Sequence, residues 1–227
     1  LIALQRALGV NPGPGGTGNR SPDTASGIPV PMIAATAGER PEFYDFSLGE
    51  QSREDWGDLA NYPLAALTYV VFDTETTGLD PTTDQVISVA VVPVEGGVIH
   101  RHAAREVLID PGVPTPPRST AVHGITDPDV AGAPDLSTAV AGLAPLLADR
   151  IVVGHNLGFD LAFLAQSGFS PGETLDTLAV SRLLWRRRGT RHTLDDLAER
   201  VGVQPADRHT ALGDALATAD VLVACLP

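Results

Sequence analysis

Two acidic residues, Asp73 and Glu75, lie two positions apart directly after an apolar run over residues 67–71. That run is rich in β-branched and aromatic residues, which predicts a buried strand ending beside the two acids. Side chains two apart on a strand share one face, so two like charges should meet next to the core. This is costly unless a cation compensates them, and carboxylates alone suit a hard ion such as Mg²⁺ or Mn²⁺. The alternative is a turn at a strand end with two incidental acids.

Two further acids and a histidine lie at the starts of predicted helices. Asp160 falls in the first turn of a helix predicted over residues 157–166, where the helix dipole alone would favour an acid. Asp214 lies beside the apolar stripe of a helix predicted over residues 210–226, where an unpaired carboxylate is expensive. His209 must lie at the entrance of that helix to point toward the same site, because helical positions i and i+5 are about 140° apart. The alternative is a surface histidine at a helix entrance.

Three blocks of sequence carry these residues. Residues 72–78 read F-D-T-E-T-T-G, residues 155–164 read H-N-L-G-F-D-L-A-F-L, and residues 209–215 read H-T-A-L-G-D-A. The blocks resemble the Exo I, Exo II and Exo III motifs of the DEDDh (DnaQ-like) 3′–5′ exonucleases of the RNase H-like superfamily. Bacterial DNA polymerase III epsilon-type exonuclease domains are the members that the chain resembles. The resemblance extends over about residues 67–224.

The resemblance implies a two-metal site and a general base. Two divalent ions, Mg²⁺ or Mn²⁺, would lie about 3.5–4 Å apart. Their ligands would be Asp73, Glu75, Asp160 and Asp214. His209 would accept the proton of the attacking water, a task that suits an imidazole with a pKa near neutrality. A sister subclass has a tyrosine four residues before the last aspartate, and this chain has Thr210 there.

The resemblance also implies residues that bind the 3′-terminal nucleotide. These candidates are Thr76, Thr77, Gly78, Leu79, Asn156 and Phe159. Leu79 would wedge against the terminal base. For His123 and His155, substrate contact and a purely structural role both stay open.

The only dense basic cluster comprises Arg182, the three arginines at 186–188, and Arg191. It would contact phosphates of an incoming strand, or it is a solvated helix end.

Composition limits the classes of function. A net charge of -13 argues against a nucleic-acid coat protein and a basic membrane-surface protein, but metal ions can neutralise an acidic nuclease site locally. The single cysteine, Cys225, excludes an intrachain disulfide and a Cys-based zinc site, which favours a cytoplasmic protein. All fifteen basic residues are arginine, so a P-loop lysine is excluded. The chain begins with Leu1 rather than Met, so we expect a fragment of a longer protein.

The pattern along the chain predicts an α/β fold, an RNase H-like mixed β-sheet flanked by helices, with an N-terminal extension. Residues 1–27 should be a flexible or upstream linker, residues 28–63 an arm that packs on the domain, and residues 64–227 the exonuclease domain. Strands are predicted over residues 69–73, 85–94, 98–109 and 151–155. Helices are predicted over residues 136–149, 157–166, 176–186, 193–201 and 210–226.

We therefore expect a metal-dependent 3′–5′ exonuclease that hydrolyses phosphodiester bonds, favours single-stranded DNA and releases nucleoside 5′-monophosphates. Its partners would be a single-stranded or frayed 3′ end of DNA and a polymerase, in proofreading, or a repair protein; no membrane contact is expected. Three alternatives stay open. They are an RNA-directed exonuclease of the RNase T or oligoribonuclease type, a non-catalytic module that binds nucleic-acid ends, and a phosphodiesterase for small nucleotides.

Overall fold

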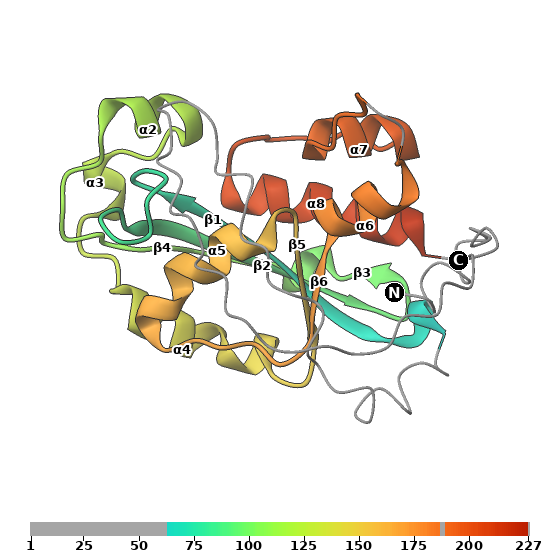
Figure 1. Ribbon diagram of the computed structural model, residues 1–227. Coiled ribbons are helices and arrows are strands. Elements are labelled where there is room, and N and C mark those ends of the chain that lie inside the picture. The colour runs from blue at the N-terminus through green and yellow to red at the C-terminus, as the bar shows by residue number, and fades with distance from the viewer. Residues whose placement is uncertain (1–62, 187–188, 227) are drawn as a thin grey trace, which may run out of the picture.

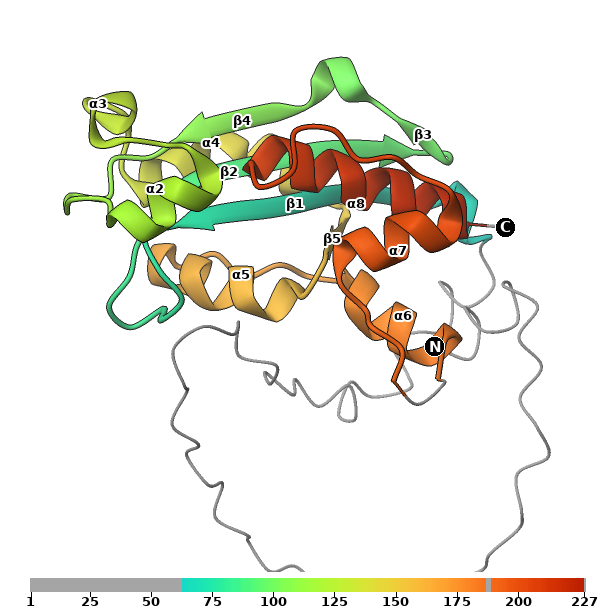
Figure 2. The same cartoon turned by 90° about the horizontal axis from the view of Figure 1, so that it is seen from above.

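The computed structural model describes residues 63–186 and 189–226. The linker predicted over residues 1–27, and the arm over residues 28–63 except Pro63, lie outside the described residues. A six-stranded mixed sheet has the order β3-β2-β1-β5-β6, and β4 also pairs with β2. Figure 1 shows helix α8 on one face of this sheet and helix α4 on the other, and Figure 2 shows the same layers from above. The predicted α/β architecture is confirmed.

Strand β1 (Thr68–Thr76) is the centre of the sheet, with all but its first residue buried. It pairs antiparallel with β2 (Val86–Glu95) along its whole length. It pairs parallel with β5 (Ile151–Gly154) only from Tyr69 to Val71, and β5 in turn pairs with β6 (Thr174–Asp176). The C-terminal half of β1 therefore extends beyond its parallel neighbour.

The hairpin predicted after β2 is confirmed, but the strand predicted over residues 98–109 is wrong as one element. Gly96 and Gly97 have φ of 56° and 74°, the positive values that a tight hairpin turn needs. The return is split into β3 (Val98–Ile99) and β4 (Arg105–Leu108) by the 3-10 turn η3 (Arg101–Ala103). Pro93 explains the break, because it has no N–H to donate to a strand pairing beside it.

Helices surround the sheet, and most begin close to their predicted positions. The longer ones are α4 (Leu136–Leu147), α5 (Leu157–Leu164), α6 (Thr177–Leu184), α7 (Leu194–Val201) and α8 (Ala211–Cys225). Helices α2 (Pro117–His123) and α3 (Asp127–Val130), strand β6, and the 3-10 turns η2 (Leu64–Ala66) and η4 (Ala165–Ser167) were not predicted. These elements are too short to show a hydrophobic period. Among the described residues, no helix has the length and apolar character needed to cross a bilayer.

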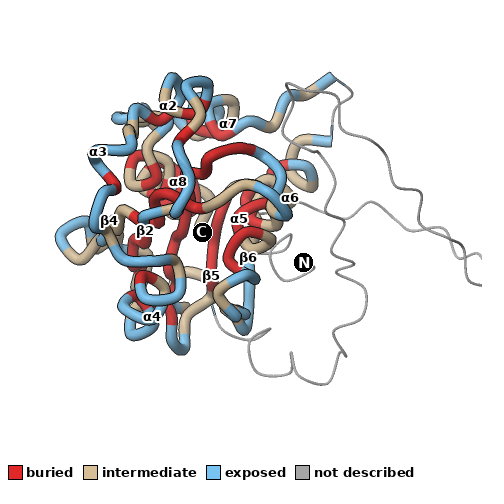
Figure 3. The backbone as a smooth tube through the Cα atoms, turned by 90° about the vertical axis from the view of Figure 1, so that its left-hand side faces the viewer, coloured by how far each residue is buried: buried red, intermediate tan, exposed pale blue. Residues whose placement is uncertain are grey.

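Alternate residues of β1 pack against different helices. Val70 and Phe72 belong to a core cluster with α4 and α5, whereas Tyr69 and Val71 belong to one with α8. The second cluster includes Ala211, Ala215 and Ala219 of α8, which are fully buried. Figure 3 shows the buried strands at the centre of the molecule. Because the alternation continues along β1, Asp73 and Glu75 lie on the face that α8 covers.

We predict that Ala219→Leu destabilises the fold by about 1–3 kcal/mol, because a larger side chain overfills the closely packed contact between α8 and the sheet. Ala224→Leu is the matched control, since Ala224 is exposed on the same helix. The measurement is the free energy of unfolding in urea. Equal stability of the two variants would show that α8 does not depend on small residues to approach β1.

Candidate active site

Asp73 and Glu75 lie inside β1 and not at its end, which corrects the strand predicted over residues 69–73. The strand continues because β2 pairs with it beyond this point, Asp73 opposite Ala90 and Glu75 opposite Ser88. On the other edge, the pairing with β5 stops after Val71. The two acids are only 8% and 6% exposed, and they lie on the α8 face of β1 beyond the point where β5 stops.

Asp214, in the first turn of α8, joins this pair. Asp73, Glu75 and Asp214 each offer a carboxylate oxygen that lies within 4.8 Å of the other two. Thr210 caps the helix by accepting a hydrogen bond from the backbone N–H of Gly213 at 3.0 Å. This cap orients the first turn of α8 toward β1, and so brings together three of the four predicted metal ligands.

Asp160 approaches β1 from α5 and is outside this group of three. It is 3% exposed, and its Oδ1 accepts hydrogen bonds from the backbone N–H and the Oγ1 hydroxyl of Thr74 at 3.1 and 2.6 Å. Thr74 alternates with Asp73 and Glu75 and faces the α4–α5 side of the strand. The contact is possible because β5 ends early and α5 begins directly beyond it. Its share in holding a metal stays a prediction.

A half-buried acid, Asp176, supports the backbone that enters α5. Asn156 adopts φ of 63°, and its N–H donates a hydrogen bond to Oδ1 of Asp176 at 2.9 Å. Burial raises the pKa of Asp176, while hydrogen bonds from the N–H groups of Leu178 and Asn156 oppose that rise. Asp176 therefore fixes the left-handed turn that aims α5, and with it Asp160, at the free edge of β1.

The converging carboxylates fit divalent metal ions. All three donors are oxygen atoms, the ligand type of Mg²⁺ and Mn²⁺, and no cysteine or histidine belongs to the group. It is the one group of three or more such ligands among the described residues. Two of its members are buried, where uncompensated like charges would be costly. The residues present therefore fit the cations that the sequence predicted.

His209 lies at the entrance of α8, where its spacing to Asp214 required it. It immediately precedes the capping residue Thr210, is exposed, and has φ of 65°. Its backbone N–H donates to Oδ1 of Asp214 at 3.0 Å. A Cβ on Gly213 would stand 1.9 Å from the carbonyl oxygen of Asp207, so the loop before α8 packs tightly on the helix.

The segment predicted to meet the terminal nucleotide directly follows Asp73 and Glu75 in β1. Thr76 and Thr77 are buried, Gly78 packs against Asp84, and Leu79 is 39% exposed. Leu79 is thus the residue that this segment presents to solvent.

The candidates from the second block differ in exposure. Asn156 is half-buried, whereas Phe159 is 3% exposed and its ring packs 5.0 Å from that of Phe163 in the core. The nucleotide contacts of all six candidates stay predictions.

Two histidines outside the metal group are held by local contacts. Nδ1 of His155 lies 3.0 Å from Oγ1 of Thr177. Nδ1 of His123 accepts a hydrogen bond from the N–H of Ile125 at 3.1 Å, and burial lowers the pKa of His123. Nε2 of His123 is buried with no hydrogen-bond partner among the described residues, so substrate contact and a structural role both stay open for the two histidines.

Three contacts at the site were not found from the sequence. Thr74 binds Asp160, Ser119 of α2 donates to the carbonyl oxygen of Thr77 at 2.6 Å, and Arg208 pairs with Asp214. Two features of the sequence could have indicated these contacts. Thr74 lies between two candidate acids, and Arg208 lies next to His209. Ser119 gave none, because α2 itself was missed.

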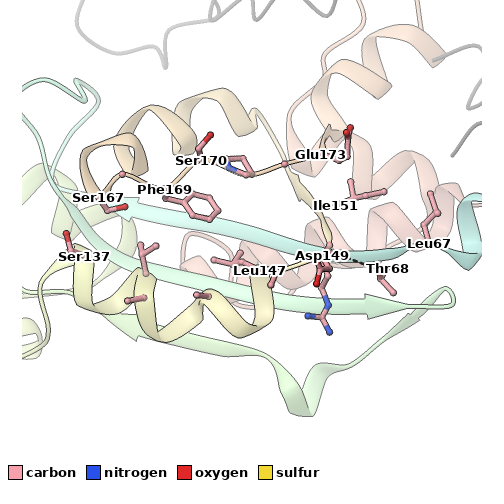
Figure 4. Close-up of a pocket in the computed structure, with 18 residues that line it drawn as sticks. Leu67, Thr68, Ser137, Leu147, Asp149, Ile151, Ser167, Phe169, Ser170 and Glu173 are labelled. Carbon is pink, nitrogen blue, oxygen red and sulfur yellow. Dashed lines mark hydrogen bonds between the residues drawn. The ribbon is translucent and has the colours of Figure 1, made fainter. Parts of the chain in front are cut away.

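A hollow in the described structure lies away from these carboxylates. It measures about 720 Å³ and is lined by α4, the start of β1 and the segment leading into β6. Figure 4 shows Leu67, Thr68 and Ile151 at one end of it and Phe169 between the helix and that segment. Since Asp73 and Glu75 lie toward the opposite end of β1, this hollow is separate from the acidic site.

Comparison with known proteins agrees with the site. The sequence model of the exonuclease family RNase_T matches residues 70–222, which include all five predicted catalytic positions. The chain belongs to this exonuclease family. The DnaQ-like, RNase H-like resemblance inferred from the three motif blocks is confirmed.

The relatives of this exonuclease chain include much longer proteins. A DNA polymerase III subunit epsilon-like protein of Rhodobacter capsulatus is 40% identical over 210 residues, which are 88% of this chain and 29% of the relative. A DNA polymerase III PolC-type protein of Thermotoga maritima is 33% identical over 162 residues, which are 69% of this chain and 12% of the relative. The chain therefore spans less than a third of these relatives.

Solved structures share the fold. Exonuclease X, in complex with 5′-overhanging duplex DNA, has 28% identity and a TM-score of 0.59, over 69% of this chain and 90% of its own. Exonuclease I of E. coli, in complex with a dT13 oligonucleotide, has 18% identity and a TM-score of 0.59, over 69% and 40%. At that identity, the second comparison supports the fold alone.

We predict that Thr74→Val destabilises the protein by about 1.5–3 kcal/mol, the range for a hydrogen bond to a charged group, because Asp160 loses its hydroxyl donor. Thr218→Val is the matched control, since Thr218 is buried and its hydroxyl has no hydrogen-bond partner among the described residues. Unfolding in urea measures both. If the control lost as much stability as Thr74→Val, the Thr74–Asp160 bond would have no special weight.

Proposed function

We propose that this chain is a metal-dependent 3′–5′ exonuclease that removes nucleoside 5′-monophosphates from 3′ ends. The observation that carries the proposal is the meeting of Asp73, Glu75 and Asp214 oxygens within 4.8 Å, with His209 at the adjacent helix entrance. Membership of the exonuclease family supports hydrolysis of nucleic acid by this site. The 3′–5′ direction rests on the match to the three motif blocks.

Each residue of the site has a distinct task in this proposal. Asp73, Glu75 and Asp214 hold the cations, and Asp160, positioned by Thr74, completes the ligand set. Bound there, two divalent ions would supply a nucleophilic water and stabilise the charge on the leaving 3′ oxygen. His209 accepts the proton of that water, and its exposure lets it pass the proton on to solvent. Leu79, exposed at the end of the buried segment 76–78, packs against the terminal base.

DNA is the favoured substrate and a polymerase the favoured partner. Two relatives are DNA polymerase III proteins, and exonuclease X was solved with duplex DNA carrying a 5′ overhang. The 3′ end at such a junction is base-paired, so it would fray from the duplex before it reached the carboxylates as a single strand. Proofreading beside a polymerase and repair of damaged ends both use this reaction. RNA remains the alternative substrate and is tested beside DNA.

We predict stepwise shortening of 5′-labelled single-stranded DNA in Mg²⁺ or Mn²⁺, with weaker shortening of the matching RNA. Asp73→Asn should abolish it and weaken Mn²⁺ binding in calorimetry, whereas Asp149→Asn, at the exposed opposite end of the sheet, should change neither. Binding of the strand without shortening would instead indicate a module that only holds ends. Hydrolysis of dinucleotides alone would indicate a small-nucleotide phosphodiesterase.

We predict that His209→Ala lowers kcat by about 10²–10⁴-fold, the usual contribution of a general base, while Mn²⁺ still binds. The reason is that His209 is outside the group of oxygen ligands. Single-turnover kinetics and calorimetry on the same preparation measure the two quantities. A loss of Mn²⁺ binding equal to that in Asp73→Asn would assign His209 to the metal site and not to proton transfer.

We predict that arginines near α6 bind the phosphates of the incoming strand. Arg182 and Arg186 are exposed there, while Arg187 and Arg188 lie outside the described residues. Replacing Arg182 and Arg186 by Gln should reduce the slope of log K against log salt by up to about 1.4, since each single-strand phosphate contact contributes about 0.7. Arg101→Gln with Arg105→Gln, on the far edge of the sheet, is the control of equal charge. An unchanged slope would leave these arginines as a solvated helix end.

A further inference from the structure

Arg208 links two helices at the acidic site. Its Nε donates a hydrogen bond to Oδ1 of Asp195 on α7 at 2.7 Å, and its Nη1 contacts Oδ1 of Asp214 on α8. The side chain of Arg208 is only 20% exposed and that of Asp214 14%, so the second contact is shielded from water. A guanidinium suits this place because its planar fork can serve two carboxylates at once.

The loop on either side of Arg208 has an unusual backbone. Asp207 and His209 have φ of 51° and 65°, in the left-handed region that residues other than glycine rarely adopt. Such conformations persist only where surrounding contacts impose them. Here Thr210 Oγ1 donates to the carbonyl oxygen of Asp207 at 2.8 Å, and the His209 N–H donates to Asp214 at 3.0 Å. Arg208 adds an ion pair between this loop and α7, and its hydrogen bond, with a smaller electrostatic contribution from His209, lowers the pKa of Asp195.

Two acids, Asp195 and Asp196, lie in the first turn of α7, and Asp195 is the one that takes no part in the helix cap. The neighbouring Asp196 forms the capping box with Thr193 and pairs with Arg191. The hydrogen bond from Arg208, followed by its charge, lowers the pKa of Asp195, so that carboxylate stays ionised at neutral pH. Burial of Arg208 disfavours its charge, but its bonds to Asp195 and Asp214 outweigh this and raise its pKa.

We propose that Arg208 is a positioning residue that ties the His209 loop to α7 through the Asp195–Arg208–Asp214 bridge. The bridge fixes the direction of His209 relative to the carboxylates. Arg208 itself takes no part in metal binding, which depends on the carboxylates. The inference rests on the proposed exonuclease function for its kinetic part only. Its structural part, the tether of the loop, can be tested without any activity.

The kinetic test compares Arg208→Gln, Arg208→Lys and Asp195→Asn at saturating Mn²⁺. We expect kcat to fall by about 10–100-fold in both Arg208 variants, since a displacement of about 1 Å of a catalytic group costs about 10²-fold. KM and the Mn²⁺ dissociation constant from calorimetry should change less than about threefold. Lysine should not rescue kcat, because an ammonium on a flexible stem cannot reproduce the fork. Rescue by lysine would overturn positioning in favour of a simple charge effect.

Asp195 separates the bridge from a direct role of Arg208 at Asp214. Asp195→Asn should lower kcat in the same direction, and the double variant with Arg208→Gln should be no worse than Arg208→Gln alone. Glu199→Gln, which removes another exposed acid of α7, is the matched control and should leave kcat unchanged. Wild-type kcat in Asp195→Asn would overturn the bridge, because the arm toward α7 would then be dispensable.

Hydrogen exchange tests the tether independently of catalysis. The amides of residues 207–214 should exchange faster in Arg208→Gln and Arg208→Lys than in the wild type, and not in Arg105→Gln, which removes the same charge from β4. Unchanged exchange in both Arg208 variants would overturn the inference. If the wild type cleaved no nucleic acid but the exchange difference were present, the proposed function would fail while the tether stood.

Discussion

The structure depends on bringing carboxylates together where β1 extends beyond β5. Asp73 and Glu75 are less than a tenth exposed, and Asp214 is aimed at them from another element. Like charges so placed repel more strongly than they would in water, because the local dielectric is low. The fold must offset this free energy before any cation binds, and the ion pair of Arg208 with Asp214 contributes to that. The β1–β2 ladder, an antiparallel pairing along nine residues of β1 with one register shift between Glu75 and Thr76, offsets part of this free energy.

Close packing of α8 determines how near Asp214 can come. Small residues on its sheet-facing side, among them Ala211 and Ala215 with no exposed surface, let the helix axis approach β1. Gly213 does the same for the loop, since a Cβ there would collide with the backbone of Asp207. Packing and the candidate site therefore depend on the same positions, because a larger side chain that weakened the core would also move Asp214. The buried alanines of α8 and Asp214 therefore lie within the same short segment at the start of the helix.

Local sequence pattern predicted where each candidate residue lies in its strand or helix, the motif resemblance grouped these residues into one site, and neither predicted the long-range contacts between elements. The period of two along β1 placed Asp73 and Glu75 together, and helix geometry placed His209 before the cap of α8. The strand was nevertheless predicted to end too early, since the pairing that extends it comes from β2. The Ser119–Thr77 and Arg208–Asp195 contacts join elements whose relative position only the folded chain defines. The spacing of apolar residues does not predict which polar side chains pair between elements.

The charge of the whole chain and the charge of the site act over different distances. A formal net charge of -13 would repel a polyanion, yet salt at physiological strength screens exposed charges beyond about 8 Å. For a chain that acts on nucleic acid, the potential at the carboxylates therefore governs the last approach of a phosphate. Cations bound there would reverse that potential, so the ions needed for hydrolysis would also admit the substrate. Arg208 offsets part of the repulsion among the acids through its ion pair with Asp214. Because it also pairs with Asp195, its charge is shared and does not replace those cations.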